Sequence, residues 1–198
     1  MKLLHLDASI TGENSVSRTV SGAIAARLKD RIPGLEIRYR DLAATPPGHL
    51  TAAHLGLGDA GAAPADLEVG QTMLDEFLAA DIVVIGAPMY NFTIPSQLKS
   101  WIDRILIAGR TFRYTENGAQ GLAGGKRVIV AVSRGGLYGP ESPAADFEHV
   151  ETYLRSVFAF IGIENPEIVI AEGVKIGEAQ RQQALAAALE TVAGLEAA

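Results

Sequence analysis

The stretch that decides the fold runs from Asp81 to Phe92 and reads D-I-V-V-I-G-A-P-M-Y-N-F. Ile82 to Ile85 is a continuous run of apolar, mostly β-branched residues, which is typical of a strand buried on both faces of a parallel sheet. A turn with aromatic and amide side chains follows it directly. Because open α/β sheets bind ligands beyond the carboxyl ends of their strands, Met89, Tyr90 and Phe92 are candidates to contact a flat, apolar ligand. The alternative is that these side chains pack beneath the next helix.

Composition restricts the possible functions. The chain has 198 residues, 48% of them hydrophobic, so we predict a single domain over residues 1–198. It has no cysteine, which excludes disulfides, thiolate zinc sites and a cysteine nucleophile. A formal net charge of −6 without a basic run disfavours nucleic acid and membranes as partners. No signal peptide and no run near ~18 apolar residues is evident, so we expect a cytoplasmic protein.

A second candidate loop lies near the N-terminus. Lys2 to Asp7 predicts a strand, and helical spacing of Ala and Leu continues to about Arg31. Between them the chain carries four hydroxyl side chains, at Ser9, Thr11, Ser15 and Ser17. Hydroxyls before the free N–H groups of a helix suit a monophosphate, whereas neither G-x-G-x-x-G nor G-x-x-x-x-G-K-[ST] is present. The alternative is an ordinary serine cap.

Strands and helices alternate along the rest of the chain. The patterns predict strands at 35–41, 126–132 and 165–171 and helices at 67–80, 95–109, 146–160 and 178–195. They also predict a small hairpin or extended loop at 110–125, with Asn117-Gly118 as its turn. This order, with right-handed crossovers, predicts an α/β three-layer sandwich with a five-stranded parallel sheet in the order 2-1-3-4-5. The first, third and fourth strands then end side by side.

The fourth strand ends in a glycine turn. Ser133, Arg134, Gly135 and Gly136 follow the apolar run V-I-V-A-V, and paired glycines let the backbone approach a planar ligand. A hydroxyl-lined phosphate site, an aromatic turn and this turn around one crevice indicate a flavin mononucleotide (FMN) site. The alternative is a plain glycine-rich loop.

Several features have open interpretations. The segment 43–66 is rich in Ala, Gly and Pro and predicts a flap or interface loop. His49 and His54 within it are poor candidates for metal ligands, and no metal site is expected. Trp101 belongs either to the core or to a contact with a second subunit. Tyr138 either stacks on a substrate or packs its own loop.

Five motifs carry a family resemblance: D-A-S-I-T-G-E-N-S-V-S-R from Asp7, A-P-M-Y-N-F from Ala87, P-S-Q-L-K-S-W-I-D from Pro95, G-R-T-F-R-Y-T-E-N-G from Gly109 and S-R-G-G from Ser133. With them the chain resembles the FMN-dependent NADH-azoreductase and quinone reductase family, which has a flavodoxin-like fold. The resemblance implies a phosphate site at Ser9, Ser15, Val16 and Ser17, ring and ribityl contacts at Met89, Tyr90, Asn91 and Phe92, and contacts to the pyrimidine side of the ring at Ser133, Arg134, Gly135 and Gly136. It also implies a homodimer with flavin at the interface.

The sequence therefore predicts an FMN-dependent oxidoreductase that takes electrons from NADH or NADPH and gives them to quinones or azo compounds by a ping-pong mechanism. Because the cofactor carries the chemistry, no catalytic acid or base is expected, and Asn91 is the candidate for a hydrogen bond to the ring. One alternative is a flavodoxin-like electron carrier without its own acceptor pocket. Another is a flavin-free α/β protein that binds a different phosphate.

Overall fold

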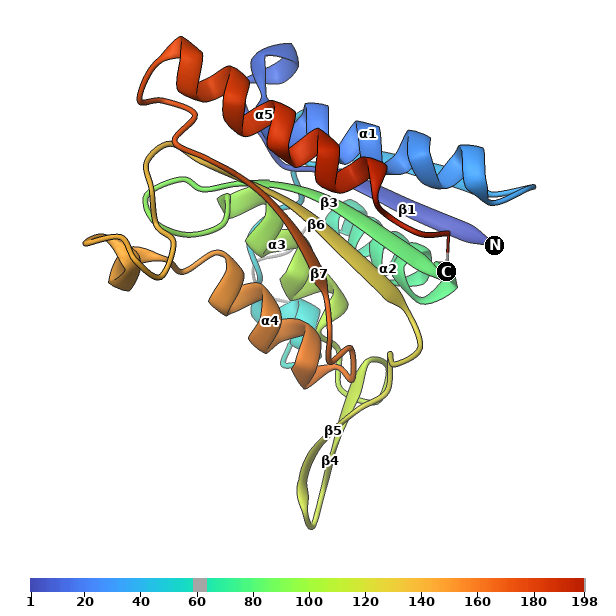
Figure 1. Ribbon diagram of the computed structural model, residues 1–198. Coiled ribbons are helices and arrows are strands. Elements are labelled where there is room, and N and C mark those ends of the chain that lie inside the picture. The colour runs from blue at the N-terminus through green and yellow to red at the C-terminus, as the bar shows by residue number, and fades with distance from the viewer. Residues whose placement is uncertain (59–63, 198) are drawn as a thin grey trace.

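The computed structural model describes residues 1–58 and 64–197, and its centre is a twisted parallel sheet (Figure 1). The five strands are β1 (Lys2–Asp7), β2 (Glu36–Asp41), β3 (Ile82–Pro88), β6 (Arg127–Arg134) and β7 (Glu167–Glu172). They pair in parallel in the order β2-β1-β3-β6-β7. Because β4 and β5 form a separate hairpin, this order confirms the predicted 2-1-3-4-5 sheet.

Helices cover both faces of the sheet. On one face lie α1 (Val16–Arg31) and α5 (Glu178–Ala193), and on the other lie α2 (Pro64–Ala79), α3 (Ser96–Ile105) and α4 (Glu151–Phe160) (Figure 1). Alternate residues of β3 enter the two cores: Val83 and Ile85 pack on the α2–α3–α4 side, and Ile82 and Val84 on the α1–α5 side. This alternation explains why the strand is an unbroken apolar run.

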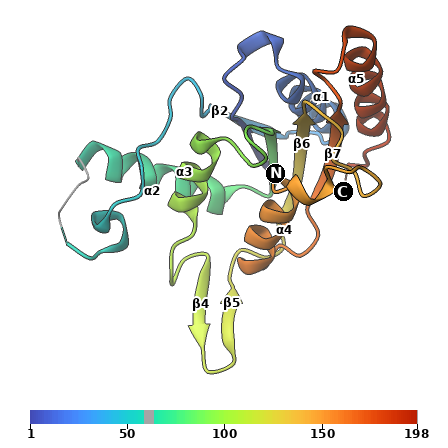
Figure 2. The same cartoon turned by 90° about the vertical axis from the view of Figure 1, so that its left-hand side faces the viewer.

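The predicted hairpin is confirmed. β4 (Phe112–Thr115) and β5 (Gly118–Gly121) pair antiparallel and project away from the three layers (Figure 2). The turn lies at residues 116–117, one residue earlier than predicted, and Gly118, the first residue of β5, has φ 105°, a backbone conformation that favours glycine. The Trp101 side chain is fully buried and its ring meets Phe77 edge to face, so this residue belongs to the core.

Several predicted boundaries are wrong. The helix expected to end near residue 109 ends at Ile105, whose carbonyl accepts a hydrogen bond from the Thr111 hydroxyl at 2.6 Å. The helix predicted over 146–160 is two elements, η3 (Ala145–Phe147) and α4, because the Glu148 carboxylate accepts from the N–H groups of Val150 and Glu151 and caps α4. Strands β3 and β6 extend farther than predicted, to Pro88 and Arg134.

The segment predicted as a flap, 43–66, lies partly outside the described residues. Its described part contains a short helix, η2 (Ala52–Leu55), and its end already belongs to α2. The buried Arg104 of α3 fastens it, because Nη2 donates to the Gly48 carbonyl at 2.8 Å and to Asp66 at 3.0 Å. His54 also pairs with Asp66, at 3.1 Å. Within residues 1–58 and 64–197, no helix is long and apolar enough to cross a membrane.

Candidate functional site

Three loops beyond the carboxyl ends of β1, β3 and β6 line one cavity of about 400 Å³. Its lining consists of Ser9, Thr11, Asn14, Ser15, Val16, Pro88, Met89, Tyr90, Asn91, Phe92, Ser133, Gly135, Tyr138, Val174, Lys175 and Arg181. The structure therefore brings together nine of the twelve predicted site residues. The other three, Ser17, Arg134 and Gly136, do not line the cavity.

The loop after β1 presents hydroxyl groups beside the start of α1. Ser15 is the N-cap of this helix, and its Oγ accepts a hydrogen bond from the Arg18 N–H at 3.3 Å. Ser17 is 1% exposed, and its Oγ lies 3.1 Å from that of Ser15, so Ser17 supports the capping serine from inside. Ser9 Oγ lies 3.0 Å from Thr11 Oγ1. The positive end of the helix dipole and these donors suit an anion.

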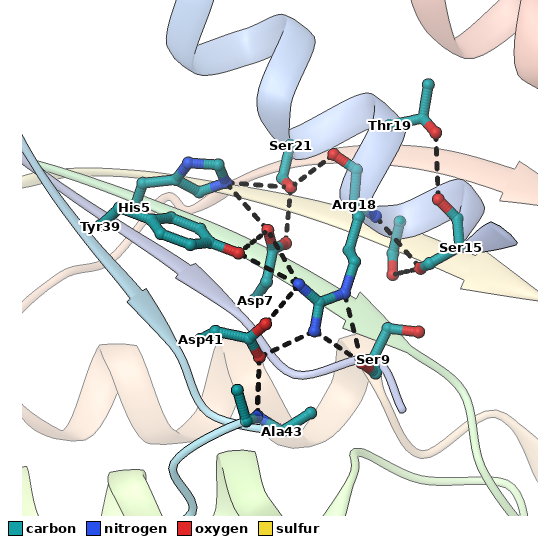
Figure 3. Close-up of polar contacts among 12 residues, drawn as sticks. His5, Asp7, Ser9, Ser15, Arg18, Thr19, Ser21, Tyr39, Asp41 and Ala43 are labelled. Atoms are coloured by element: carbon teal, nitrogen blue, oxygen red, sulfur yellow. Dashed lines mark hydrogen bonds and ion pairs between the residues drawn. The ribbon is translucent and has the colours of Figure 1, made fainter. Parts of the chain in front are cut away.

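Arg18 ties this loop to the end of β2 (Figure 3). Its guanidinium donates to both oxygens of Asp41, each at 2.7 Å, and to the Ser9 carbonyl at 2.8 Å. These hydrogen bonds hold the pKa of Asp41 below its ordinary value. Because the guanidinium bonds both Asp41 and the Ser9 carbonyl, it joins the loop after β1 to the end of β2.

Asp7 is the buried centre of the same network (Figure 3). Its carboxylate accepts from the Ser21 hydroxyl at 2.7 Å and from the Tyr39 hydroxyl at 3.1 Å. Burial nevertheless raises the pKa of Asp7, and it raises that of Tyr39 to about 12. Any side chain at Gly86, beside Asp7 in the sheet, would overlap the carboxylate, which explains the glycine within a buried strand.

The loop after β3 is a two-residue turn under backbone strain. Tyr90 and Thr93 form a mutual backbone bridge, with N···O distances of 2.9 and 3.2 Å. The two residues between them both have positive φ, 49° at Asn91 and 74° at Phe92, as in a type I′ turn. Asparagine tolerates this conformation, but phenylalanine does not favour it. Phe92 is 46% exposed, so it is not held there by burial beneath the next helix.

Tyr90 joins the loops after β1 and β3. Its hydroxyl lies 3.1 Å from Ser9 Oγ and accepts from the Ile10 N–H at 3.2 Å. The ring of Phe92 packs against Phe147 and Tyr138, at centroid distances of 5.2 and 6.4 Å. Tyr138 lines the cavity and its ring packs on Phe92 of the neighbouring loop, and its stacking on a substrate stays a prediction.

At the end of β6, the Arg134 side chain is directed into the protein. It is 2% exposed and pairs with Glu148 at 3.2 Å and Glu151 at 3.1 Å. The backbone of the loop is fixed by the segment after β7: the carbonyls of residues 134, 135 and 136 accept from the N–H groups of residues 174, 175 and 173. Arg134 thus supports the loop through α4 rather than contacting the cavity.

Sequence reasoning missed the contribution of the segment after β7. Val174, Lys175 and Arg181 line the cavity from there. The signal that could have found them is topological, since β7 is parallel to β6 and its carboxyl end reaches the same edge of the sheet. Nothing in the residue types between 172 and 181 resembles a binding motif.

Known proteins resemble this chain over its full length. A family model described as flavodoxin-like fold matches residues 1–195. The chain is 62% identical to an FMN-dependent NADH:quinone oxidoreductase of Methylorubrum extorquens over 207 residues, covering 100% of both. Among solved structures, an azoreductase of Bacillus anthracis has a TM-score of 0.86 at 32% identity, covering 98% of this chain and 97% of the other. An FMN-dependent NADH-azoreductase of the same species, solved in complex with FMN, has a TM-score of 0.84 at 30% identity, covering 96% and 95%.

Proposed function

The chain belongs to the flavodoxin-like fold family, and we propose that within it the protein is an FMN-dependent oxidoreductase that carries two electrons from NADH or NADPH to quinones and azo compounds. The observation that carries this proposal is the convergence of three loops, from β1, β3 and β6, on one cavity. The names of the relatives, FMN-dependent NADH:quinone oxidoreductase and azoreductase, support it.

The residues of the cavity fit FMN. One end carries the hydroxyls of Ser9 and Ser15 and the start of α1, which suit the phosphate. The other end carries Met89, Phe92 and the backbone of Gly135, which suit a planar, largely apolar ring. No carboxylate lines the cavity among the described residues, so an anion meets no repulsion there.

Bound there, FMN would supply the two-electron redox chemistry between the nicotinamide and the acceptor. The chain's own residues bind and orient it. We assign to Asn91, which lines the cavity from the strained turn, the hydrogen bond to the ring edge. We assign to the N–H group of Gly135, which lines the cavity, the role of donor to the pyrimidine side, since the carbonyls of this loop are already bonded to residues 173–175.

We also propose that the protein is a cytoplasmic homodimer of one-domain subunits, with the acceptor bound between them. A second cavity of about 900 Å³ adjoins the first and shares five lining residues with it, Thr11, Met89, Tyr90, Asn91 and Lys175. Its remaining wall includes the start of α3 and Tyr153 of α4. A partner subunit over this opening would exclude water from the reacting edge of the ring.

The test starts from the absorbance spectrum of the purified full-length protein, which is expected to show bound flavin. Anaerobic titration with NADH and, separately, NADPH should bleach that spectrum without any acceptor. A simple quinone or azo dye added afterwards should restore it, and steady-state double-reciprocal plots should be parallel. Protein that is reduced but turns over neither acceptor would be an electron carrier. Colourless protein that does not take up FMN would refute the proposal.

A further inference from the structure

Two basic side chains line a cavity whose other lining residues are uncharged. They are Lys175, which follows β7, and Arg181, in the first turn of α5. Lys175 packs on the glycine turn after β6, where its Cγ would lie 3.5 Å from a Cβ placed at Gly135. Arg181 lies at the opposite end, because its Nη2 donates to the Asn14 carbonyl at 2.8 Å. Asn14 directly precedes the capping Ser15.

The position of Arg181 leaves its charge available to a ligand. In the described part of the chain, its side chain forms a single hydrogen bond and no ion pair, although a guanidinium has five N–H donors. Helix stability does not explain the residue, since a cation near the N-terminus of a helix opposes the helix dipole. Arg18, the other arginine near the hydroxyl loop, is occupied by Asp41 and Ser9.

We propose that Arg181 binds the phosphate of FMN, as the counter-charge that the loop after β1 itself lacks. This inference rests on the proposed function, because it assigns a residue to the phosphate of that cofactor. The hydroxyls of Ser9 and Ser15 donate to the phosphate from the loop between β1 and α1, and the guanidinium of Arg181 closes the site from α5. Arginine suits this role because its planar fork matches phosphate oxygens.

The experiment compares the binding of FMN and riboflavin, which share the ring and differ in the phosphate. Full-length protein freed of flavin is titrated with each by fluorescence quenching, as wild type and as Arg181→Ala, Arg181→Gln and Arg181→Lys. Gln keeps an N–H donor for the Asn14 carbonyl and removes the charge. Arg27→Ala is the matched control, since Arg27 of α1 likewise donates to a carbonyl, that of Ala193 at 2.7 Å, but does not line the cavity.

The expected result is a dissociation constant for FMN about tenfold to hundredfold higher in Arg181→Ala and Arg181→Gln, because hydrogen bonds to charged groups contribute ~1.5–3 kcal/mol. Arg181→Lys should lose less affinity for FMN, and riboflavin should bind all variants with equal affinity. Arg27→Ala should match wild type. An unchanged ratio of FMN to riboflavin affinity in Arg181→Gln would overturn the inference, as would equal losses for both ligands. Wild-type protein that binds neither flavin would instead refute the proposed function, and this inference with it.

Discussion

Replacing Arg18 with methionine should lower the free energy of unfolding by about 2–3 kcal/mol. The substitution keeps the apolar stem and removes the guanidinium that bridges Asp41 and Ser9. The two charged side chains are 17% and 25% exposed, between a surface pair and a buried one. Surface ion pairs contribute roughly 0–1 kcal/mol, and removing one partner of a buried pair costs roughly 3–5 kcal/mol, so we take an intermediate value. In this variant Asp41 still accepts hydrogen bonds from the N–H groups of Ala43 and Ala44, which limits the loss of stability.

The assay is urea unfolding of the flavin-free protein, with linear extrapolation of the free energy. For a chain of this length the expected loss corresponds to a fall in Tm of about 5–10 °C. Arg110→Met is the control, because Arg110 pairs with Asp75 at 3.1 Å but the two side chains are 45% and 57% exposed. This control should lose no more than about 1 kcal/mol.

A double-mutant cycle of Arg18→Met, Asp41→Asn and the double variant then measures the coupling energy between the two side chains. We expect a coupling energy of about 1–2 kcal/mol, within the range measured for residues in direct contact. A loss in Arg18→Met no larger than that in Arg110→Met, or a coupling energy near zero, would refute the argument that this network holds the loop after β1.

Three further predictions concern single side chains. Tyr90→Phe removes the hydroxyl that contacts Ser9 and Ile10, so FMN affinity should fall about tenfold, since each lost hydrogen bond costs ~1 kcal/mol; unchanged affinity in a flavin titration would contradict this. Phe92→Gly should leave Tm nearly unchanged, because relief of strain of roughly 1–2 kcal/mol at φ 74° offsets the lost ring contacts, while quinone turnover falls; a large fall in Tm would show that the turn is not strained. Asp41→Asn tests pH dependence: the pKa of Asp41 in the folded protein lies below its ordinary 3.8, so its stabilisation is complete above that pH and is lost as pH falls through the folded value. The difference in Tm between wild type and Asp41→Asn should therefore be constant near neutral pH and shrink in acid. A difference that grows in acid would contradict the lowered pKa of Asp41 in the folded protein.

The order of the sheet followed from the sequence because it depends on local features. Buried strands are identified by three apolar runs, which follow Lys2, span Ile82 to Ile85 and span 126–132. The right-handed crossovers between parallel strands then limit the order of these strands in the sheet. The convergence of their loops followed from the same topology, which is why nine of the predicted site residues line one cavity.

The remaining features depend on pairings between distant side chains. The hydrogen bond between Arg18 and Asp41 joins residues that are 23 positions apart, and nothing in the sequence pattern indicates that these two residues are partners. Arg134 belongs to a motif, yet its side chain turns to Glu148 and Glu151, which only the packing of α4 reveals. The positive φ of Phe92 could not be inferred either, because aromatic residues rarely adopt it.

We propose that FMN lies across the carboxyl edge of the sheet, with its phosphate at the loop after β1 and its ring at the loops after β3 and β6. The most direct measurement is a crystal structure of the full-length protein grown with saturating FMN. Phosphate oxygens are expected within hydrogen-bond distance of Ser9 or Ser15, and the ring between Asn91 and Gly135. Flavin bound elsewhere, or an empty cavity at saturation, would contradict it.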